Sequence, residues 1–166
     1  PIALYYAMPL HSNGAGKVIV SEPSGLRAGY ALDCGADAVI NPMTEDLHAR
    51  VMELTGGLGA DICVDAVGTL IGDAIANTRR GGRIVLIGLN EHARQEICET
   101  DIMKNGLTVI GNYNGRFSMT PTVKMLSSGV IPVEKMITHR LPLSRFGEGL
   151  EAMRSGEALE VILYPD

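Results

Sequence analysis

The sequence predicts an α/β fold built around a doubly wound, mostly parallel sheet. Short runs rich in β-branched residues alternate with helical patterns along the whole chain. Several of these runs are continuously apolar, which is typical of strands that are covered on both faces. The resulting order of strand, helix and strand is that of a doubly wound domain, and we expect a single domain over residues 1–166.

The expected strands are short apolar runs at 17–20, 37–40, 61–67, 83–88, 107–111 and 160–164. Between them, three segments carry apolar side chains at helical spacing, and such stripes are expected to face the core. Their members are Leu47, Val51, Met52 and Leu54; Met119, Val123 and Leu126; and Phe146, Leu150 and Met153.

Capping residues predict where several helices begin and end. Ser24 and Ser144 are expected to cap the N-termini of helices through their hydroxyl groups. Gly35, Gly81 and Gly106 each follow a helical pattern, where a left-handed residue commonly ends the helix.

The start of the chain departs from the pattern of a complete doubly wound sheet. Residues 3–13 indicate a helix, although Pro9 inside it would kink or break that helix. No strand pattern precedes the helix, whereas the first strand of such a fold is central. We therefore expect the sheet to lack its first strand, which would leave two ladder edges unpaired.

Composition excludes several classes of partner. Of 166 residues, 46% are hydrophobic, 20% are charged and only 4% are aromatic, and the net charge is −5. An acidic chain without basic runs disfavours nucleic acid and anionic membranes as partners. No apolar run approaches the length of a membrane span. The three cysteines show no C-x-x-C motif, which favours free thiols in a reducing cytoplasm.

A phosphate-binding loop is the first motif to be excluded. Gly14-Ala15-Gly16-Lys17 precedes a strand, whereas a phosphate loop opens a helix, and Val18 follows the lysine in place of Ser or Thr. This segment is expected to be a turn. The four histidines show no metal-binding spacing, so we predict neither a metal site nor catalytic residues.

Glu22 is the strongest candidate for a binding residue. It ends the apolar run Val18-Ile19-Val20-Ser21, where an acid in a dinucleotide-binding unit accepts hydrogen bonds from the ribose hydroxyls of adenosine. An exposed acid that merely ends a strand is the simpler alternative. Methyltransferases that use S-adenosylmethionine also hold a ribose in this way, so Glu22 alone does not fix the cofactor.

Several longer stretches resemble the coenzyme domain of the zinc-type alcohol dehydrogenases, the medium-chain dehydrogenase/reductase family with a Rossmann-like fold. The stretches that carry the resemblance are "VIVSEPSGLRAGYALDCGADAVINP", "GADICVDAVG", "RRGGRIVLIGLN", "MKNGLTVIGNYNGR" and "ITHRLPLSRFGEGLEAMRSGEALEVILYPD". They occur in the family's order and cover essentially the whole chain. The segment around "GLTVIGNYNGR" is most similar to the polyol and threonine dehydrogenase branch.

The resemblance implies a set of cofactor-binding residues. Pro1 and Ile2 match the end of the family's glycine loop, Glu22 matches the ribose acid, and Arg27 matches the basic residue beside it. The remaining residues match positions that line the nicotinamide half of the cofactor. They are Val67, Gly68, Ile87, Gly88, Leu89, Asn112 and Asn114. An acid at position 22 repels a 2′-phosphate, so the resemblance implies NAD(H) over NADP(H).

The resemblance also implies what this chain would not do alone. The family's zinc ligands, proton relay and substrate pocket belong to a catalytic domain for which the chain has no counterpart. Glu160 stands where the family usually has Lys or Arg near the pyrophosphate. We therefore expect a cytoplasmic NAD-binding domain that is inactive by itself and forms a homo-oligomer through an edge strand near residues 107–113. A non-catalytic nucleotide-binding or interaction module and an S-adenosylmethionine-binding domain remain as alternatives.

Overall fold

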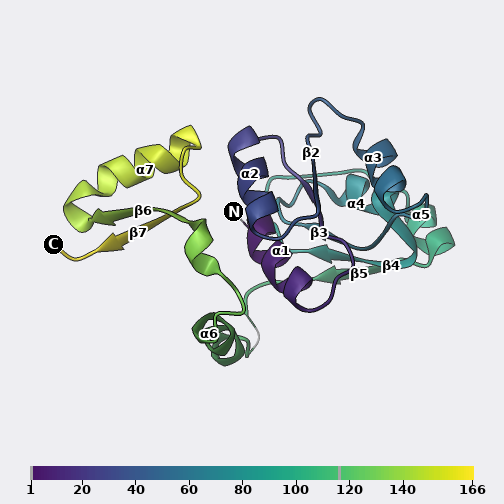
Figure 1. Ribbon diagram of the computed structural model, residues 1–166. Helices are drawn as coiled ribbons and strands as arrows, with labels where there is room; N and C mark the ends of the chain where they lie inside the picture. The colour runs from purple at the N-terminus through teal and green to yellow at the C-terminus, as the bar shows by residue number, and fades with distance from the viewer. Residues whose placement is uncertain (1, 116) are drawn as a thin grey trace. The chain divides into compact units, whose positions relative to one another are not determined.

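The computed structural model of the chain describes residues 2–115 and 117–166. These residues form two compact units, one from residues 2–43 and 117–166 and the other from residues 44–115. Figure 1 shows the elements of both units. The strands assemble into three parallel sheets in the described residues, with the orders β1-β2, β3-β4-β5 and β6-β7.

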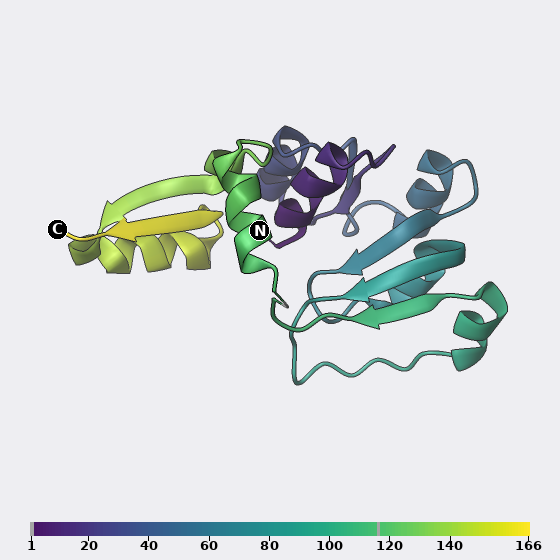
Figure 2. The ribbon, with the colours of Figure 1, turned by 90° about the horizontal axis from the view of Figure 1, so that it is seen from below.

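The first unit contains two of these sheets and four of the α-helices that the structure describes. Its elements are α1 Ile2–Ser12, β1 Ile19–Ser21, α2 Gly25–Asp33, β2 Ala38–Ile40, α6 Met119–Ser127, β6 Ile137–Pro142, α7 Phe146–Ser155 and β7 Glu160–Tyr164, with 3₁₀ turns at Val133–Met136 and Leu143–Arg145. Figure 2 shows α7 along one face of the β6-β7 pair. Ser24 caps α2 as predicted, because its side chain accepts a hydrogen bond from the backbone N–H of Arg27.

Aliphatic and sulfur-containing side chains fill the core of the first unit. Leu4 and Met8 of α1, Val20 of β1, Met136 and Leu159 all belong to this one cluster. Residues before 43 and after 117 therefore share a single hydrophobic core. Burial of such side chains is the main source of stability for a chain with so few aromatic residues.

The second unit is a three-stranded parallel sheet with helices. Its elements are α3 Leu47–Leu54, β3 Ala60–Asp65, α4 Ile71–Asn77, β4 Thr78–Leu86, α5 Glu99–Asn105 and β5 Thr108–Gly111. The three arrows of the sheet run in the same direction in Figure 2. Ile84 is completely buried at the centre of the unit's core, where Ala74 of α4 and Leu107 pack against it.

The predicted α/β fold class with parallel strands is confirmed. The strand β1 pairs with β2, and β3 pairs with β4 in a separate sheet. Helix α1 continues through Pro9, so Pro9 does not break the helix. The carbonyl of Pro9 accepts hydrogen bonds from the backbone N–H and side-chain amide of Asn13, which close the end of the helix.

Two of the three apolar stripes do not face the core, contrary to prediction. The stripe on α3 is buried or half-buried, as expected. The stripes on α6 and α7 are exposed, with 76% of Met119 and 52% of Phe146 accessible to solvent. A helical period shows which side of a helix is apolar, but it does not show whether another element covers that side.

Some predicted element ends also differ from the structure. Gly81 adopts a φ of 70° inside β4 instead of ending a helix, because β4 begins directly after α4. Ser144 lies in the 3₁₀ turn before α7, and its hydroxyl group donates a hydrogen bond to Asp166. The N-cap position of α7 is occupied by Arg145 instead. Gly106, by contrast, caps α5 in the left-handed conformation as predicted. Strand β6 was not expected, since His139 and Arg140 interrupt its apolar pattern.

The described helices are all too short or too polar to cross a lipid bilayer. The length of an α-helix that spans the hydrocarbon core is about 20 residues.

The three cysteines should differ strongly in reactivity in the folded chain. Burial raises the pKa of the Cys34 thiol and of the Cys63 thiol, which lowers the fraction of reactive thiolate at neutral pH, whereas Cys98 is exposed. Titration with a chromophoric disulfide should give one fast-reacting thiol in the native chain and all three in denaturant. The fast phase should disappear in Cys98→Ser. A fast phase that persists in that variant would contradict the burial of the other two thiols.

Candidate functional site

Glu22 lies directly after β1 and is held there by its backbone and its side chain. Its backbone N–H donates to the carbonyl of Ile40 at 3.0 Å, which extends the pairing with β2 by one residue. Its side-chain oxygen Oε1 accepts from the backbone N–H of Ser24 at 2.9 Å. The carboxylate is therefore fixed at the carboxyl end of a parallel strand, which is where ligands bind in doubly wound sheets.

Arg27 forms an ion pair with the same carboxylate. The distance from its Nη2 to Oε1 of Glu22 is 2.9 Å, and the side chains are 31% and 16% exposed. The structure thus brings together the two residues that the sequence placed at the ribose end of a cofactor. Both of the contacts use Oε1, so Oε2 can accept hydrogen bonds from a pair of vicinal hydroxyl groups. The ion pair also offsets the charge of Arg27 that would otherwise attract an anion.

In the second unit, the predicted residues of the nicotinamide half gather at the carboxyl edge of the β3-β4-β5 sheet. The parallel register aligns Asp65 with Leu86 and Leu86 with Gly111, so the three strands end at one level. Val67 and Gly68 follow β3, and Ile87, Gly88 and Leu89 follow β4. The side chains of Val67 and Leu89 are 56% and 67% exposed at this edge, which leaves them accessible to a ligand.

Asn112 and Asn114 follow the third strand of this sheet. The backbone N–H of Asn112 donates to the carbonyl of Leu86 at 2.9 Å, which continues the pairing of β5 with β4 past the end of the strand. Asn114 adopts a left-handed φ of 57°. Both residues are exposed. The structure therefore places Asn112 beside the end of β4, close in register to the loop that begins at Ile87.

Gly68 and Gly88 bring the loops after β3 and β4 into direct backbone contact. A Cβ atom on Gly68 would lie 2.5 Å from the carbonyl oxygen of Gly88, and a Cβ atom on Gly88 would lie 2.1 Å from the nitrogen of Gly68. Gly68 also has a φ of 85°, which favours glycine. These glycines are therefore required for the two loops to pack together, whatever ligand lies against them.

Sequence reasoning missed the residue that holds these loops, Asp65. It is the last residue of β3, only 3% exposed, and its carboxylate accepts three backbone hydrogen bonds from the loop that follows. The signal in the sequence was an acid that interrupts the apolar run between Ile62 and Val67.

Glu160 at the start of β7 places a carboxylate close to Tyr5 of α1. Ile2 begins α1 and is 48% exposed, whereas Pro1, the other residue expected at the end of a glycine loop, lies outside the described residues. Burial is the main cause that raises the pKa of Tyr5 to about 12, and a hydrogen bond with Glu160 at the start of β7 adds to it. A carboxylate beside the first half of α1 opposes an anion there, because the N-terminal end of a helix is otherwise favourable for negative charge.

Metal-binding residues do not converge anywhere in residues 2–115 and 117–166. No group of three or more His, Cys, Asp or Glu side chains in this part of the chain could hold a metal ion. A structural or catalytic zinc site needs three or four such ligands in tetrahedral arrangement.

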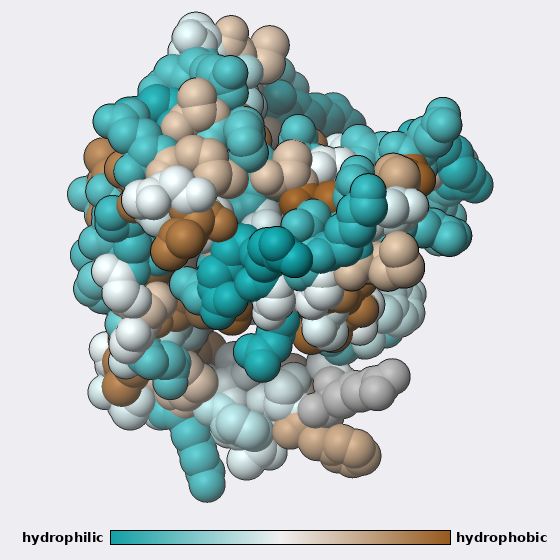
Figure 3. All heavy atoms as spheres, turned by 90° about the vertical axis from the view of Figure 1, so that its right-hand side faces the viewer, coloured by the Kyte–Doolittle hydropathy of each residue, from teal (hydrophilic) through white to brown (hydrophobic). Residues whose placement is uncertain are grey.

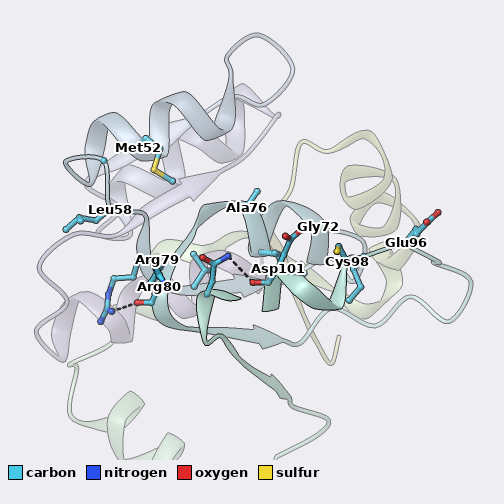
Figure 4. A pocket seen from close by; sticks show the side chains of 14 residues that line it. Met52, Leu58, Gly72, Ala76, Arg79, Arg80, Glu96, Cys98 and Asp101 are labelled. Atoms are coloured by element: carbon cyan, nitrogen blue, oxygen red, sulfur yellow. Dashed lines mark hydrogen bonds between the residues drawn. The ribbon is translucent and has the colours of Figure 1, made fainter. Parts of the chain in front are cut away.

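A shallow pocket of about 390 Å³ lies at the opposite edge of the second unit's sheet, near the start of β4 (Figure 4). Gly72 of α4, Asp101 of α5 and Cys98, which immediately precedes α5, contribute to its lining. Its arginines already have protein partners, since Nε of Arg79 lies 2.6 Å from Asp61 and Nη2 of Arg80 donates to a backbone carbonyl. On the face drawn in Figure 3, apolar residues form small groups among hydrophilic ones. The pocket is thus distinct from the residues that the sequence predicted.

Comparison with protein families gives a match to the family described as zinc-binding dehydrogenase, over residues 1–128. L-Threonine 3-dehydrogenase of Bacillus licheniformis is 34% identical over 169 residues, which cover 99% of this chain and 49% of that protein. Sorbitol dehydrogenase of Bombyx mori is 28% identical and covers 99% of this chain and 48% of its own length. The chain thus spans about half the length of the curated relatives that it matches.

Solved structures share the fold. The crystal structure of an alcohol dehydrogenase from Thermotoga maritima superimposes with a TM-score of 0.88 and 32% sequence identity. The match covers 98% of this chain and 47% of that one. The arrangement of strands and helices described above is therefore similar to that of about half of the Thermotoga maritima chain.

Ionisation of Tyr5 should occur far above the pH at which an exposed tyrosine ionises. The folded chain holds its proton up to about pH 12, whereas the unfolded chain releases it near 10.0. The contribution of protonated Tyr5 to the free energy of unfolding is therefore fully present below pH 10.0 and is lost as the pH rises through about 12. Near-ultraviolet absorbance of the native chain minus that of Tyr5→Phe should isolate this transition.

Glu160→Gln serves as the companion variant in the same titration. It should lower the pKa of Tyr5 only partway, because burial is the larger cause of the shift. A return of the Tyr5 transition to its ordinary range in this variant would show that the carboxylate, and not burial, dominates.

Proposed function

Because this chain belongs to the zinc-binding dehydrogenase family, we propose that it binds NAD(H) as the coenzyme-binding part of an alcohol or polyol dehydrogenase. The resemblance to zinc-type alcohol dehydrogenases, including the threonine and polyol dehydrogenase branch, is confirmed. The chain spans only about half of its curated relatives, so the activity and substrate of a whole protein are part of the proposal.

Glu22 carries the proposal. Its carboxylate is fixed at the carboxyl end of β1 by Ser24 and Arg27, with Oε2 able to accept from two ribose hydroxyls. A carboxylate in this position favours NAD(H) over NADP(H), because a 2′-phosphate would add negative charge beside it. Arg27 does not reverse this preference while its charge is offset by the ion pair.

The glycine contact in the second unit supports the same proposal for the nicotinamide half. A nicotinamide ring is flat, and it can rest against backbone that lacks side chains. Gly68 and Gly88 provide such backbone, and the exposed side chains of Val67 and Leu89 stand beside it. The exposed amides of Asn112 and Asn114 are proposed to lie near the carboxamide of the cofactor.

The residues of this chain do not fit the zinc ion that the family's description implies. No suitable ligand group exists in the part of the chain that the structure describes, so no step through zinc is assigned to it. We propose that the chain supplies cofactor binding only. A non-catalytic interaction module is the second candidate, which the carboxylate of Glu160 beside α1 favours, since it opposes binding of a pyrophosphate.

The proposed mode of self-association is pairing of β5 edges. The strand β5 lies at the edge of its sheet, and all four of its residues are exposed. An exposed edge strand presents backbone groups that can pair with another copy. A cytoplasmic location stays a prediction from the sequence.

Calorimetric titration of the chain with NADH, NADPH and S-adenosylmethionine tests the cofactor proposal. We expect NADH to bind tightest and Glu22→Ala to weaken NADH binding by about tenfold or more, because hydrogen bonds to a charged group are lost. NADPH binding by that variant should improve relative to NADH, since Arg27 would be released. The matched control is Glu151→Ala, which removes an exposed acid from α7.

Two outcomes of this titration would contradict the proposal. One is wild-type binding of NADPH or S-adenosylmethionine that is as tight as that of NADH. The other is unchanged NADH affinity in Glu22→Ala. Absence of binding to all three ligands would favour the interaction module without a nucleotide.

Purified chain with NAD should show no dehydrogenase turnover. The substrates to be tested are L-threonine, sorbitol and ethanol, with and without added Zn²⁺, and the formation of NADH is followed by its absorbance. We expect rates equal to those of a protein-free blank, because the described residues provide no zinc site. Turnover that increases in proportion to protein concentration would overturn this prediction.

A further inference from the structure

Asp65 is a buried carboxylate at the point where β3 ends. Its side chain accepts hydrogen bonds from the backbone N–H groups of Val67 at 2.9 Å and Gly68 at 2.7 Å through Oδ1. The other oxygen, Oδ2, accepts from the N–H of Leu70 at 2.9 Å. Since only 3% of the residue is exposed, water has almost no access to this carboxylate, and the protein must supply its hydrogen bonds.

A buried carboxylate has a cost that an aliphatic residue would avoid. Burial of an unpaired charge in a protein interior is strongly unfavourable, and hydrogen bonds from the protein must offset it. Here the three donors are all backbone N–H groups of one short loop. Asp65 therefore fixes the course of that backbone from Val67 to Leu70, the residue before α4.

The backbone of Asp65 also holds the neighbouring loop. Its carbonyl oxygen accepts from the N–H of Ile87 at 3.0 Å and from the N–H of Gly88 at 2.9 Å. One residue thus binds both loops, with its side chain on the loop after β3 and its carbonyl on the loop after β4. We call residues 65–70 together with 87–88 the platform.

The close packing of Gly68 against Gly88 completes the platform. The two loops touch through backbone atoms, so a small movement of either one would open the contact. The hydrogen bonds to the carboxylate keep Gly68 in its left-handed conformation, with a φ of 85°. Asp65 lies beneath this surface and does not reach it.

We propose that Asp65 is a positioning residue, which holds the platform in the shape that receives the nicotinamide half of the cofactor. This inference rests on the proposed function, since the platform consists of residues expected to line that half. Asp65 would not contact the cofactor. Substitution of Asp65 should therefore reduce the contribution of the nicotinamide group to the binding affinity, while the contribution of the adenosine end stays the same.

Asp65→Asn is the most informative substitution because it preserves size and removes one acceptor. Its Oδ1 could still accept from Val67 and Gly68, but its NH₂ group would face the N–H of Leu70, donor against donor. Asp73→Asn is the matched control, since Asp73 is an exposed acid of the adjacent helix α4. Circular dichroism establishes that both variants fold.

Amide hydrogen exchange tests the fixed backbone without any ligand. In the wild-type chain, the amides of Val67, Gly68 and Leu70 should be protected although they lie outside a strand or helix. In Asp65→Asn, exchange at Leu70 should accelerate about tenfold or more, because this backbone donor loses its partner. The amides of β4 that face β5 should be unaffected. Unprotected platform amides in the wild-type chain would overturn the proposal even if the variant failed to fold.

Paired titrations with NADH and ADP-ribose test the positioning role. ADP-ribose has the adenosine, the pyrophosphate and the second ribose of NADH, but it has no nicotinamide. The wild-type chain should bind NADH more tightly than ADP-ribose, and Asp65→Asn should reduce that ratio several-fold while leaving the affinity for ADP-ribose unchanged. Gly88→Ala should act in the same way through its clash with Gly68, whereas Gly111→Ala, which has open space for a Cβ atom, should not.

The outcomes separate this inference from the proposed function. A wild-type chain that binds neither ligand would overturn the proposed function and the positioning role with it. A wild-type chain that binds NADH, with a ratio that Asp65→Asn leaves unchanged, would overturn the positioning role alone. Equal weakening of both ligands in Asp65→Asn would also overturn it, because that result indicates only a general loss of structure.

Discussion

Parallel pairing of β3, β4 and β5 is the constraint on which the candidate site of the second unit depends. Parallel strands that pair in register end at one edge of their sheet, so the segments that follow them must meet there. At this edge each loop has to find partners for backbone groups that the ladder no longer satisfies. Asp65 provides acceptors for both loops, and the lack of side chains at Gly68 and Gly88 allows the loops to approach closely.

Charge is placed differently at the two ends of the first unit's candidate site. At the end of β1, a carboxylate and a guanidinium offset each other, which leaves a hydrogen-bond acceptor with little net attraction for an anion. Near the start of α1, Glu160 forms a hydrogen bond with Tyr5 at a place where helical N–H groups would otherwise favour negative charge. Both arrangements favour neutral, hydroxyl-bearing portions of a ligand over its phosphates.

Features of the sequence that are local in origin were predicted well. Residues 160–164 form a strand with the predicted bounds, Ser24 caps α2, and Gly106 ends α5, because each depends on residues within one or two turns. The position of Glu22 beside Arg27 was likewise predictable, since only four residues separate the two in the sequence. Only the resemblance to a family, however, predicted which strand ends would line the nicotinamide half of a cofactor.

Features that depend on distant parts of the chain were not predictable. The stripes on α6 and α7 are apolar on one side but exposed, because burial requires a second surface that a helical period cannot reveal. Strand β6 was missed because pairing with β7 stabilises a segment whose own pattern is mixed. Asp65 was missed because its partners are backbone groups, which leave no mark on the sequence.

The contact between Gly68 and Gly88 restricts how this surface can change by mutation. In each case the atoms that a new side chain would strike belong to the backbone of the other loop, not to a side chain that a second substitution could shorten. Compensating pairs of substitutions are therefore not accessible at these two positions. Any redesign of the surface for a different ligand has to keep both glycines and vary the residues around them, such as Val67 and Leu89, whose side chains are exposed.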